Sequence, residues 1–307
     1  MEKISFKGII EIFKNAFQGF SDNKVTKLSG SLAYSVIFSL GPLLIVIISL
    51  CGLFLGRDAI EGKVYSSLAN FIGSDTAKQL EQIIRNASLS GKSEVAIIIG
   101  VISLLIGATS IFGEIQDSIN TIWGLKSKPK RGWLKFLQNR FLSFSIIIGL
   151  GFLLLVSLGV SSLIDAFSDE LRIHFPYIAF IIIYTVNITI TFIVTACIFA
   201  VIFKVLPDAN IHWKDVAAGA IATTLFFMLG KFGISFYISK SNVGSTYGAA
   251  GSLIILLLWV YYSSIILYFG AELTKSYAVK YGSAIHPAAY AVTTKLVEVE
   301  SDLPTNK

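Results

Sequence analysis

Long hydrophobic runs recur along the chain, and short polar segments separate them. A helix that crosses a bilayer needs roughly 20 predominantly apolar residues. Six segments reach that length, so we predict an all-α membrane protein with about six transmembrane helices. The predicted spans are residues 28–56, 95–123, 141–167, 177–206, 216–238 and 247–277.

Two further segments carry apolar residues at helical spacing outside these spans. In residues 6–20 the apolar positions predict a helix that either lies in the cytoplasmic membrane interface or packs on the bundle. The connection over residues 57–94 carries two apolar stripes, separated at Gly73, and predicts two amphipathic helices that cover the outer face. The apolar positions of the first segment are Phe6, Ile9, Ile10, Phe13, Phe17 and Phe20.

The placement of positive charge predicts the orientation of the spans. Connections on the cytoplasmic side of membrane proteins carry an excess of Lys and Arg. Here 17 of these residues fall on the side that holds both termini, and seven fall on the other side. Both termini are therefore predicted to be cytoplasmic, and the net charge of +6 is explained without nucleic acid.

Composition agrees with a membrane protein and leaves no room for a separate soluble domain. The chain has 307 residues, 54% of them hydrophobic and only 14% charged, with a mean hydropathy of +0.73. We divide it into a cytoplasmic amphipathic interfacial segment (1–27), a six-helix transmembrane domain (28–280) and a polar cytoplasmic tail (281–307), which we expect to be loose after Gly282. Residues 1–27 are polar and bear Lys residues, so we do not expect them to be a cleaved signal peptide.

The sequence contains few residues in patterns typical of hydrolytic enzymes or metal sites. The sequence has three histidines and two cysteines, without the spacing of a zinc or haem site. The glycine-rich run at residues 248–252 lacks the lysine of a phosphate-binding loop. We therefore predict no enzymatic activity, no cofactor and no metal.

Polar and charged residues inside the spans are the best candidates for a functional site. Charges near the centre of a spanning helix cost about 2.5–3.5 kcal/mol each on insertion scales, and they mark interior or functional positions. We hypothesise a vestibule facing the cytoplasm, in which Glu114 or Glu272 pairs with Lys204 or Arg140. Helix packing or a structural ion pair at the bundle end explains the same pattern. The candidate vestibule residues are Glu114, Asp117, Asn120, Asn187, Lys204 and Glu272.

Two glycine-containing positions are candidate hinges. Gly41 and Pro42 interrupt the first span, where proline frees a backbone carbonyl and tends to kink the helix. An inert kink is the simpler interpretation of this pair. Gly248 and Gly251 precede the last span and suit either close helix packing or a flexible helix start.

Several short motifs together resemble the YihY/BrkB family, whose members are also labelled ribonuclease BN-like. The resemblance covers roughly residues 10–280 and implies a six-helix protein of the bacterial inner membrane. At family level it suggests envelope integrity, serum resistance and transport of lipid or lipopolysaccharide, and it transfers no catalytic residues. The motifs are GSLAY (30–34), SLGPL (39–43), SINTIWG (118–124), LPD (206–208), WKD (213–215), YGAAGS (247–252), LWVY (258–261) and GAEL (270–273).

From these features we expect a non-enzymatic, transporter-like protein that handles a lipid or another amphipathic envelope substrate. Membrane lipids, with anionic headgroups at the cytoplasmic face, are its expected partners. The alternative is a membrane scaffold for envelope assembly that binds a protein partner through residues 57–94. Ribonuclease activity is a disfavoured third interpretation, and no nucleic acid is expected.

Overall fold

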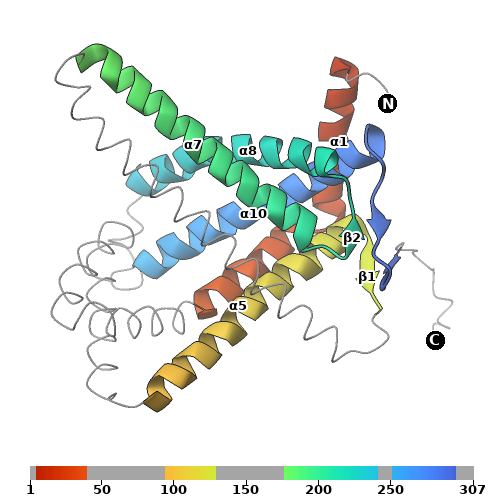
Figure 1. Cartoon of the computed structure of the whole chain (residues 1–307), viewed down its shortest axis with the longest axis horizontal. Helices are drawn as coiled ribbons and strands as arrows, with labels where there is room; N and C mark the ends of the chain where they lie inside the picture. Colours follow the sequence, from red (N-terminus) through yellow and green to blue (C-terminus); the bar gives the residue numbers. More distant parts are fainter. Residues whose placement is uncertain (1–4, 40–93, 129–175, 241–250, 295–307) are drawn as a thin grey trace, which may run out of the picture.

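The computed structural model describes residues 5–39, 94–128, 176–240 and 251–294. These parts of the chain are mostly helical (Figure 1). The helices are α1 (Phe6–Asp22), a helix that covers residues 25–39 to the edge of the described range, α5 (Glu94–Trp123), α7 (Pro176–Val205), α8 (Trp213–Lys240) and α10 (Gly251–Lys280).

The helices coincide with the hydrophobic runs. Within the described residues, α5 and α7 begin and end within one residue of the segments predicted at 95–123 and 177–206. Helices α8 and α10 begin and end within a few residues of the segments predicted at 216–238 and 247–277. The segment 141–167, residues 57–93 of the outer connection and residues 40–56 of the first predicted span lie outside the described residues.

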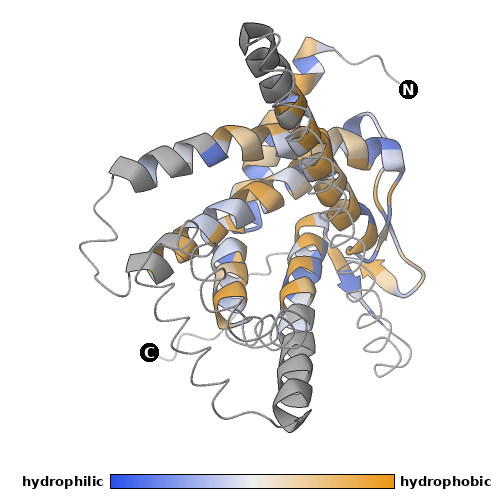
Figure 2. Ribbon diagram, turned by 60° about the vertical axis from the view of Figure 1, so that its left-hand side comes forward, coloured by the Kyte–Doolittle hydropathy of each residue, from blue (hydrophilic) through white to orange (hydrophobic). Residues whose placement is uncertain are grey.

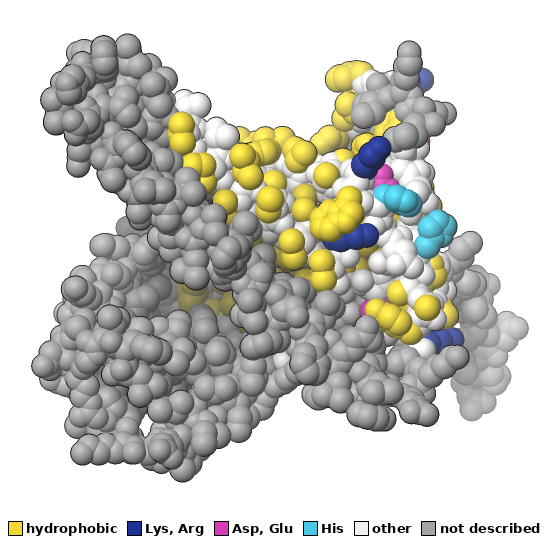
Figure 3. Space-filling view, viewed as in Figure 1, with side chains coloured by type: hydrophobic (Ala, Val, Ile, Leu, Met, Phe, Trp, Pro, Cys, Tyr) yellow, Lys and Arg dark blue, Asp and Glu magenta, His cyan; other side chains and the backbone are white. Residues whose placement is uncertain are grey.

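Two of these helices are long and apolar enough to cross a membrane. The qualifying stretches are Ile188–Val205 in α7 and Leu256–Lys280 in α10. Only 17% of the first stretch is buried inside the protein, and Ile188 and Ile193 in it are exposed. Such a surface is typical of contact with lipid rather than water. Figure 2 shows hydrophobic residues along the described helices, and Figure 3 shows hydrophobic side chains over much of one described face.

One end of the bundle is closed by two short antiparallel sheets, and we call it the strand end. Strand β1 (Leu125–Ser127) pairs with β4 (Ala291–Thr293), and β2 (Ala209–Asn210) pairs with β3 (His286–Pro287). The last residues of α5, α7 and α10 and the first residues of α8 converge there, at the right-hand edge of Figure 1. Strands β3 and β4 thus pair with β2 and β1, whereas the sequence predicted a loose tail after Gly282.

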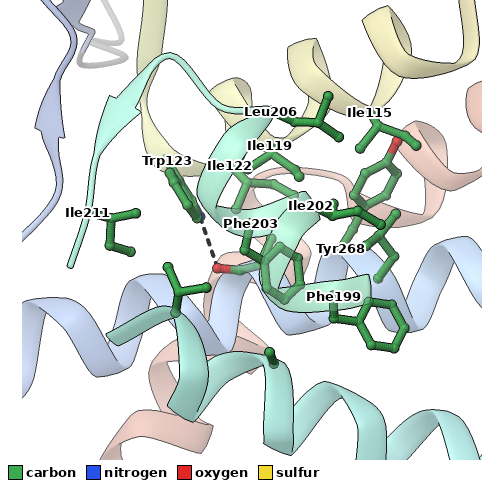
Figure 4. Packing of buried hydrophobic residues seen from close by; sticks show 14 of the residues in the cluster. Ile115, Ile119, Ile122, Trp123, Phe199, Ile202, Phe203, Leu206, Ile211 and Tyr268 are labelled. Carbon is green, nitrogen blue, oxygen red and sulfur yellow. Dashed lines mark hydrogen bonds between the residues drawn. The ribbon is translucent and has the colours of Figure 1, made fainter. Parts of the chain in front are cut away.

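The hydrophobic core lies just inside the strand end (Figure 4). It joins the last turns of α5 and α7 to α10 through large side chains that are almost fully buried. The indole N–H of Trp123 donates a hydrogen bond to the carbonyl oxygen of Ala271 at 3.0 Å, so the indole nitrogen remains satisfied inside the core. Core residues include Ile119, Ile122, Phe203, Leu206, Val216 and Tyr268.

Helices α8 and α10 pack through two reciprocal glycine–threonine contacts. Gly219 on α8 lies against Thr274 on α10, and Gly270 on α10 lies against Thr223 on α8. Each threonine hydroxyl donates to the carbonyl oxygen four residues earlier in its own helix, at 2.7 and 2.8 Å. The hydroxyls are thus satisfied locally, while the glycines let the two backbones approach closely.

Helix α1 has three faces of different character. Gly8, Ile12 and Ala16 form the buried face, which packs on α10 at Leu273 and Tyr281. Beside it, Phe6, Ile10 and Phe17 are exposed apolar residues. The remaining face carries Lys7, Glu11, Lys14 and Gln18. The helix therefore packs on the bundle, which is one of the two interpretations of the sequence pattern, and leaves an apolar side exposed.

Candidate binding pocket

The strand end contains a pocket of about 630 Å³. Its lining comes from parts of the chain that are far apart in sequence, namely the connection after α1, the last turns of α5, strand β1, α10 and the end of β4. Polar and charged side chains predominate in it. The lining residues are Asn23, Asp117, Asn120, Thr121, Gly124, Leu125, Lys126, Ser127, Lys275 and Thr294.

Two hydrogen bonds between α5 and α10 hold the end of α5 at the pocket: α10 donates one of them and α5 donates the other. The ammonium group of Lys275 donates to the carbonyl oxygen of Ile122 at 2.6 Å. This carbonyl belongs to the last turn of α5, where helical carbonyls lack partners within the helix and a cation is favourable. Together with the Trp123 contact to Ala271, it fixes the end of α5 against α10.

Glu272 lies directly behind the pocket. Its side chain is 1% exposed, and the amide group of Asn23 donates a hydrogen bond to its Oε1 at 2.6 Å. Gly19 of α1 leaves the space for this carboxyl group, because a Cβ atom there would lie 2.8 Å from Cδ of Glu272. Asn23 thus contacts Glu272 and lines the pocket at the same time.

Asn120 also lines the pocket and belongs to a second buried polar cluster. The side-chain amides of Gln116 and Asn120 each donate to the carboxylate of Asp208 at 3.0 Å. The backbone N–H of Asp208 donates to Oδ1 of Asn120 at 2.9 Å. All three residues are buried, so this cluster ties α5 to the connection between α7 and α8.

The pocket lies at the foot of a polar face on α5. Ser110, Asp117 and Thr121 are exposed along this face, and Glu114 between them is half-buried. Farther along, Gly107 lies against Ser39 of the helix over residues 25–39, whose hydroxyl lies 3.3 Å from the Gly107 carbonyl oxygen. Ser110, Glu114, Asp117 and Thr121 therefore form a polar face on α5, and the last two of them also line the pocket.

A known protein family matches most of this chain. The model of the family described as Virulence factor BrkB matches residues 16–291. The chain belongs to this family. A UPF0761 membrane protein of Haemophilus influenzae (strain 86-028NP) is 29% identical over 263 residues, which cover 84% of this chain and 91% of that protein.

Other members of the BrkB family show similar coverage. A UPF0761 membrane protein of Pseudoalteromonas atlantica is 29% identical over 262 residues, covering 81% of this chain and 80% of that protein. One from Mannheimia succiniciproducens is 25% identical over 281 residues, covering 89% and 92%. These relatives are named as membrane proteins, which confirms the resemblance to YihY/BrkB proteins and the membrane class. No solved structure is significantly similar to this chain.

In this BrkB-family chain, the structure brings together some of the predicted vestibule residues. Asp117 and Asn120 line the pocket, and Glu272 adjoins it through Asn23. Lys204 has other neighbours: its ammonium group donates to the Ile211 carbonyl oxygen at 2.5 Å and lies 5.7 Å from the ring centre of Trp213. In the described parts of the chain, the partner of Glu272 is therefore the amide group of Asn23 and not the hypothesised cation Lys204.

The remaining predicted positions contribute less. Gly251 is the first residue of α10. Gly41, Pro42, Gly248 and Arg140 lie outside the described residues, as does the side chain of Asn187. Among the described residues, no group of three His, Cys, Asp or Glu side chains is arranged to hold a metal ion.

Sequence reasoning missed Asn23, Lys126 and Lys275 as pocket residues. Lys126 and Lys275 were counted only as charges that set the orientation, and Asn23 lies between two helices. Lys24 adopts a left-handed backbone conformation (φ 50°), and the chain there passes from α1 into the next helix. The motif SINTIWG (118–124) ends at Gly124, also at a positive φ of 68°, and was the available signal for this part of the pocket.

Proposed function

We propose that this chain is a multi-pass protein of the bacterial inner membrane that moves or presents a lipid or another amphipathic substrate without changing it chemically. About six helices cross the membrane, and both termini and the strand end face the cytoplasm. The exposed apolar surface of α7 supports the membrane crossing. The cytoplasmic position of the strand end rests on the excess of positive residues on that side of the sequence.

The observation that carries the proposal is the polar face of α5 that leads to the polar pocket. Moving a polar headgroup through an apolar phase without compensating hydrogen bonds costs several kcal/mol. A row formed by Ser110, Glu114, Asp117 and Thr121 lowers that cost for a headgroup that moves along α5. The acyl chains of the same substrate remain beside apolar helix surfaces.

Transfer of a fluorescent phospholipid between the leaflets of reconstituted liposomes tests this function. We expect the wild-type protein to accelerate the transfer, and Glu114→Gln together with Asp117→Asn to slow it. Glu11→Gln is the control for loss of an acid, because Glu11 is exposed on α1, pairs with Lys280 and does not line the pocket. Absence of transfer by folded wild-type protein would refute the proposal and would favour the scaffold alternative.

A further inference from the structure

The charge and hydrogen-bonding groups of the pocket indicate the chemistry of its ligand. We infer that the pocket binds a phosphodiester group through the ammonium groups of Lys126 and Lys275. This inference deepens the proposed function, since it names the part of an amphipathic substrate that the pocket recognises.

The formal charge of the lining fits a single negative charge. Lys126 and Lys275 contribute two positive charges, and Asp117 contributes one negative charge. The lining is thus positive by one unit, which a phosphodiester monoanion neutralises. A phosphomonoester dianion would leave an excess negative charge at the end of α5, where the helix dipole already favours cations.

The donors in the lining also favour phosphate oxygens as acceptors. The ammonium group of Lys275 has three N–H donors, and the Ile122 carbonyl oxygen accepts one of them. The hydroxyl of Ser127 is buried and has no hydrogen-bond partner within the described parts of the chain. Hydrogen bonds between ammonium groups and phosphate are charge-assisted and roughly twice as strong as neutral ones.

The size of the pocket exceeds that of a phosphate group alone. A volume of about 630 Å³ lies within the range of about 300–1,000 Å³ found for small-molecule sites. It therefore accommodates a phosphodiester with its polar substituent, such as a phosphoglycerol headgroup. Either a membrane lipid or a soluble glycerophosphodiester supplies that chemistry.

Calorimetric titration of the purified full-length protein in detergent distinguishes the two sources. The probes are dihexanoyl phosphatidylglycerol, glycerophosphoglycerol and the uncharged dihexanoylglycerol. We expect saturable binding of the first and none of the third. Binding of glycerophosphoglycerol with similar affinity would assign the pocket to soluble phosphodiesters, and its failure to bind would assign the pocket to the lipid. Absence of binding by both phosphodiesters would overturn the inference.

Variants locate the site. Lys126→Gln and Lys275→Gln each remove a charge-assisted hydrogen bond, which predicts a loss of affinity of about tenfold or more. Lys126 is the cleaner position because Lys275 also holds the end of α5. Lys214→Gln is the matched control, since Lys214 is an exposed lysine in the first turn of α8 and does not line the pocket. Equal losses in Lys126→Gln and Lys214→Gln would overturn the inference, because binding would then reflect general surface charge.

Binding and transfer fail independently. Lipid binding that requires Lys126, combined with no leaflet-to-leaflet transfer, would support the pocket assignment and refute transport. Transfer that is unchanged in Lys126→Gln, with no phosphodiester bound, would refute the pocket assignment and leave transport standing.

Discussion

At the scale of single residues, Glu272 of α10 is a buried acid that joins this helix to the turn between α1 and the next helix. Its carboxyl group is buried between α10 and α1, accepts a hydrogen bond from Asn23, and has Lys275 and Asp22 as its charged neighbours. A buried polar group of this kind is costly to leave without a partner. The contact therefore holds α1 and the following helix on α10, next to the pocket.

Substitution of Glu272 separates its shape from its charge. Glu272→Ala removes the acceptor for Asn23 and leaves a void, so we expect a loss of about 1–3 kcal/mol in unfolding free energy. Glu272→Gln keeps an acceptor oxygen of the same size, and we expect a smaller loss. Thermal unfolding of the purified variants in detergent measures both. Equal stability of wild type and Glu272→Ala would show that the Asn23 contact contributes nothing.

Gly19 of α1 also lies against the carboxyl group of Glu272. In Gly19→Ala the new methyl group would overlap the Glu272 carboxyl group, which is fixed and buried, so we expect destabilisation by about 1–3 kcal/mol. Gly30→Ala is the matched control, because nothing lies within 4 Å of a Cβ atom at Gly30. Alanine at that position should be neutral or stabilise the helix by up to about 1 kcal/mol. Equal thermal stabilities of the Gly19→Ala and Gly30→Ala variants would show that the close approach of Gly19 to Glu272 does not matter for stability.

At the scale of secondary-structure elements, the closest described helix pair is α8 with α10, and its packing depends on glycine. In Gly270→Ala the added methyl group would collide with the side chain of Thr223, whose Cβ would lie 2.8 Å away. Overpacking of this kind typically costs about 1–3 kcal/mol. We expect a corresponding fall in thermal stability in detergent, while Gly233→Ala on α8, with nothing within 4 Å, should cause none.

A double variant tests the origin of that fall. Thr223→Ala removes the two atoms nearest to the methyl group of Gly270→Ala. We therefore expect the double variant to lose less stability than the sum of the losses in the two single variants. Purely additive losses would show that the two helices do not depend on this contact.

The sequence predicted these helices well and their connections poorly, for a physical reason. The bounds of α5 and α7 follow from hydrophobic runs, which are local properties of the chain. Strand β1 pairs with β4 across more than 160 residues, and neither strand exceeds three residues, so no local pattern predicts them. The tail was predicted to be loose because its residues are polar, but backbone hydrogen bonds rather than apolar burial fix residues 286–293.

The same distinction explains the candidate site. Asp117, Asn120 and Glu272 were predicted because a polar residue inside an apolar run is visible in the sequence. Asn23 was missed because its role arises from a tertiary contact made by the turn after α1. The partner of Glu272 was predicted to be a cation, because counting residues along the helices gives the depth of each side chain. Depth does not specify which side of a helix faces a given neighbour, so the prediction could not identify Asn23.

At the scale of the whole molecule, the orientation of the strand end determines which leaflet reaches the pocket. The two polar faces of the membrane differ in accessibility to an impermeant thiol reagent. The test uses a protein in which Cys51 and Cys197 are replaced and one new cysteine is introduced. The new cysteine is Asn306→Cys in the tail or Ser74→Cys in the connection over residues 57–94, and its labelling by the reagent is measured.

We expect Ser74→Cys to be labelled in intact spheroplasts, and Asn306→Cys only after the membrane is opened. The reason is the asymmetry of Lys and Arg, which places the tail and strand β1 on the cytoplasmic side. Because Lys126 and Lys275 belong to that end, the pocket would then take its ligand from the cytoplasmic leaflet, and movement along α5 would run outward from it. Labelling of Asn306→Cys in intact spheroplasts would reverse the orientation and place the pocket on the outer side. The polar face of α5 would then lead inward from it.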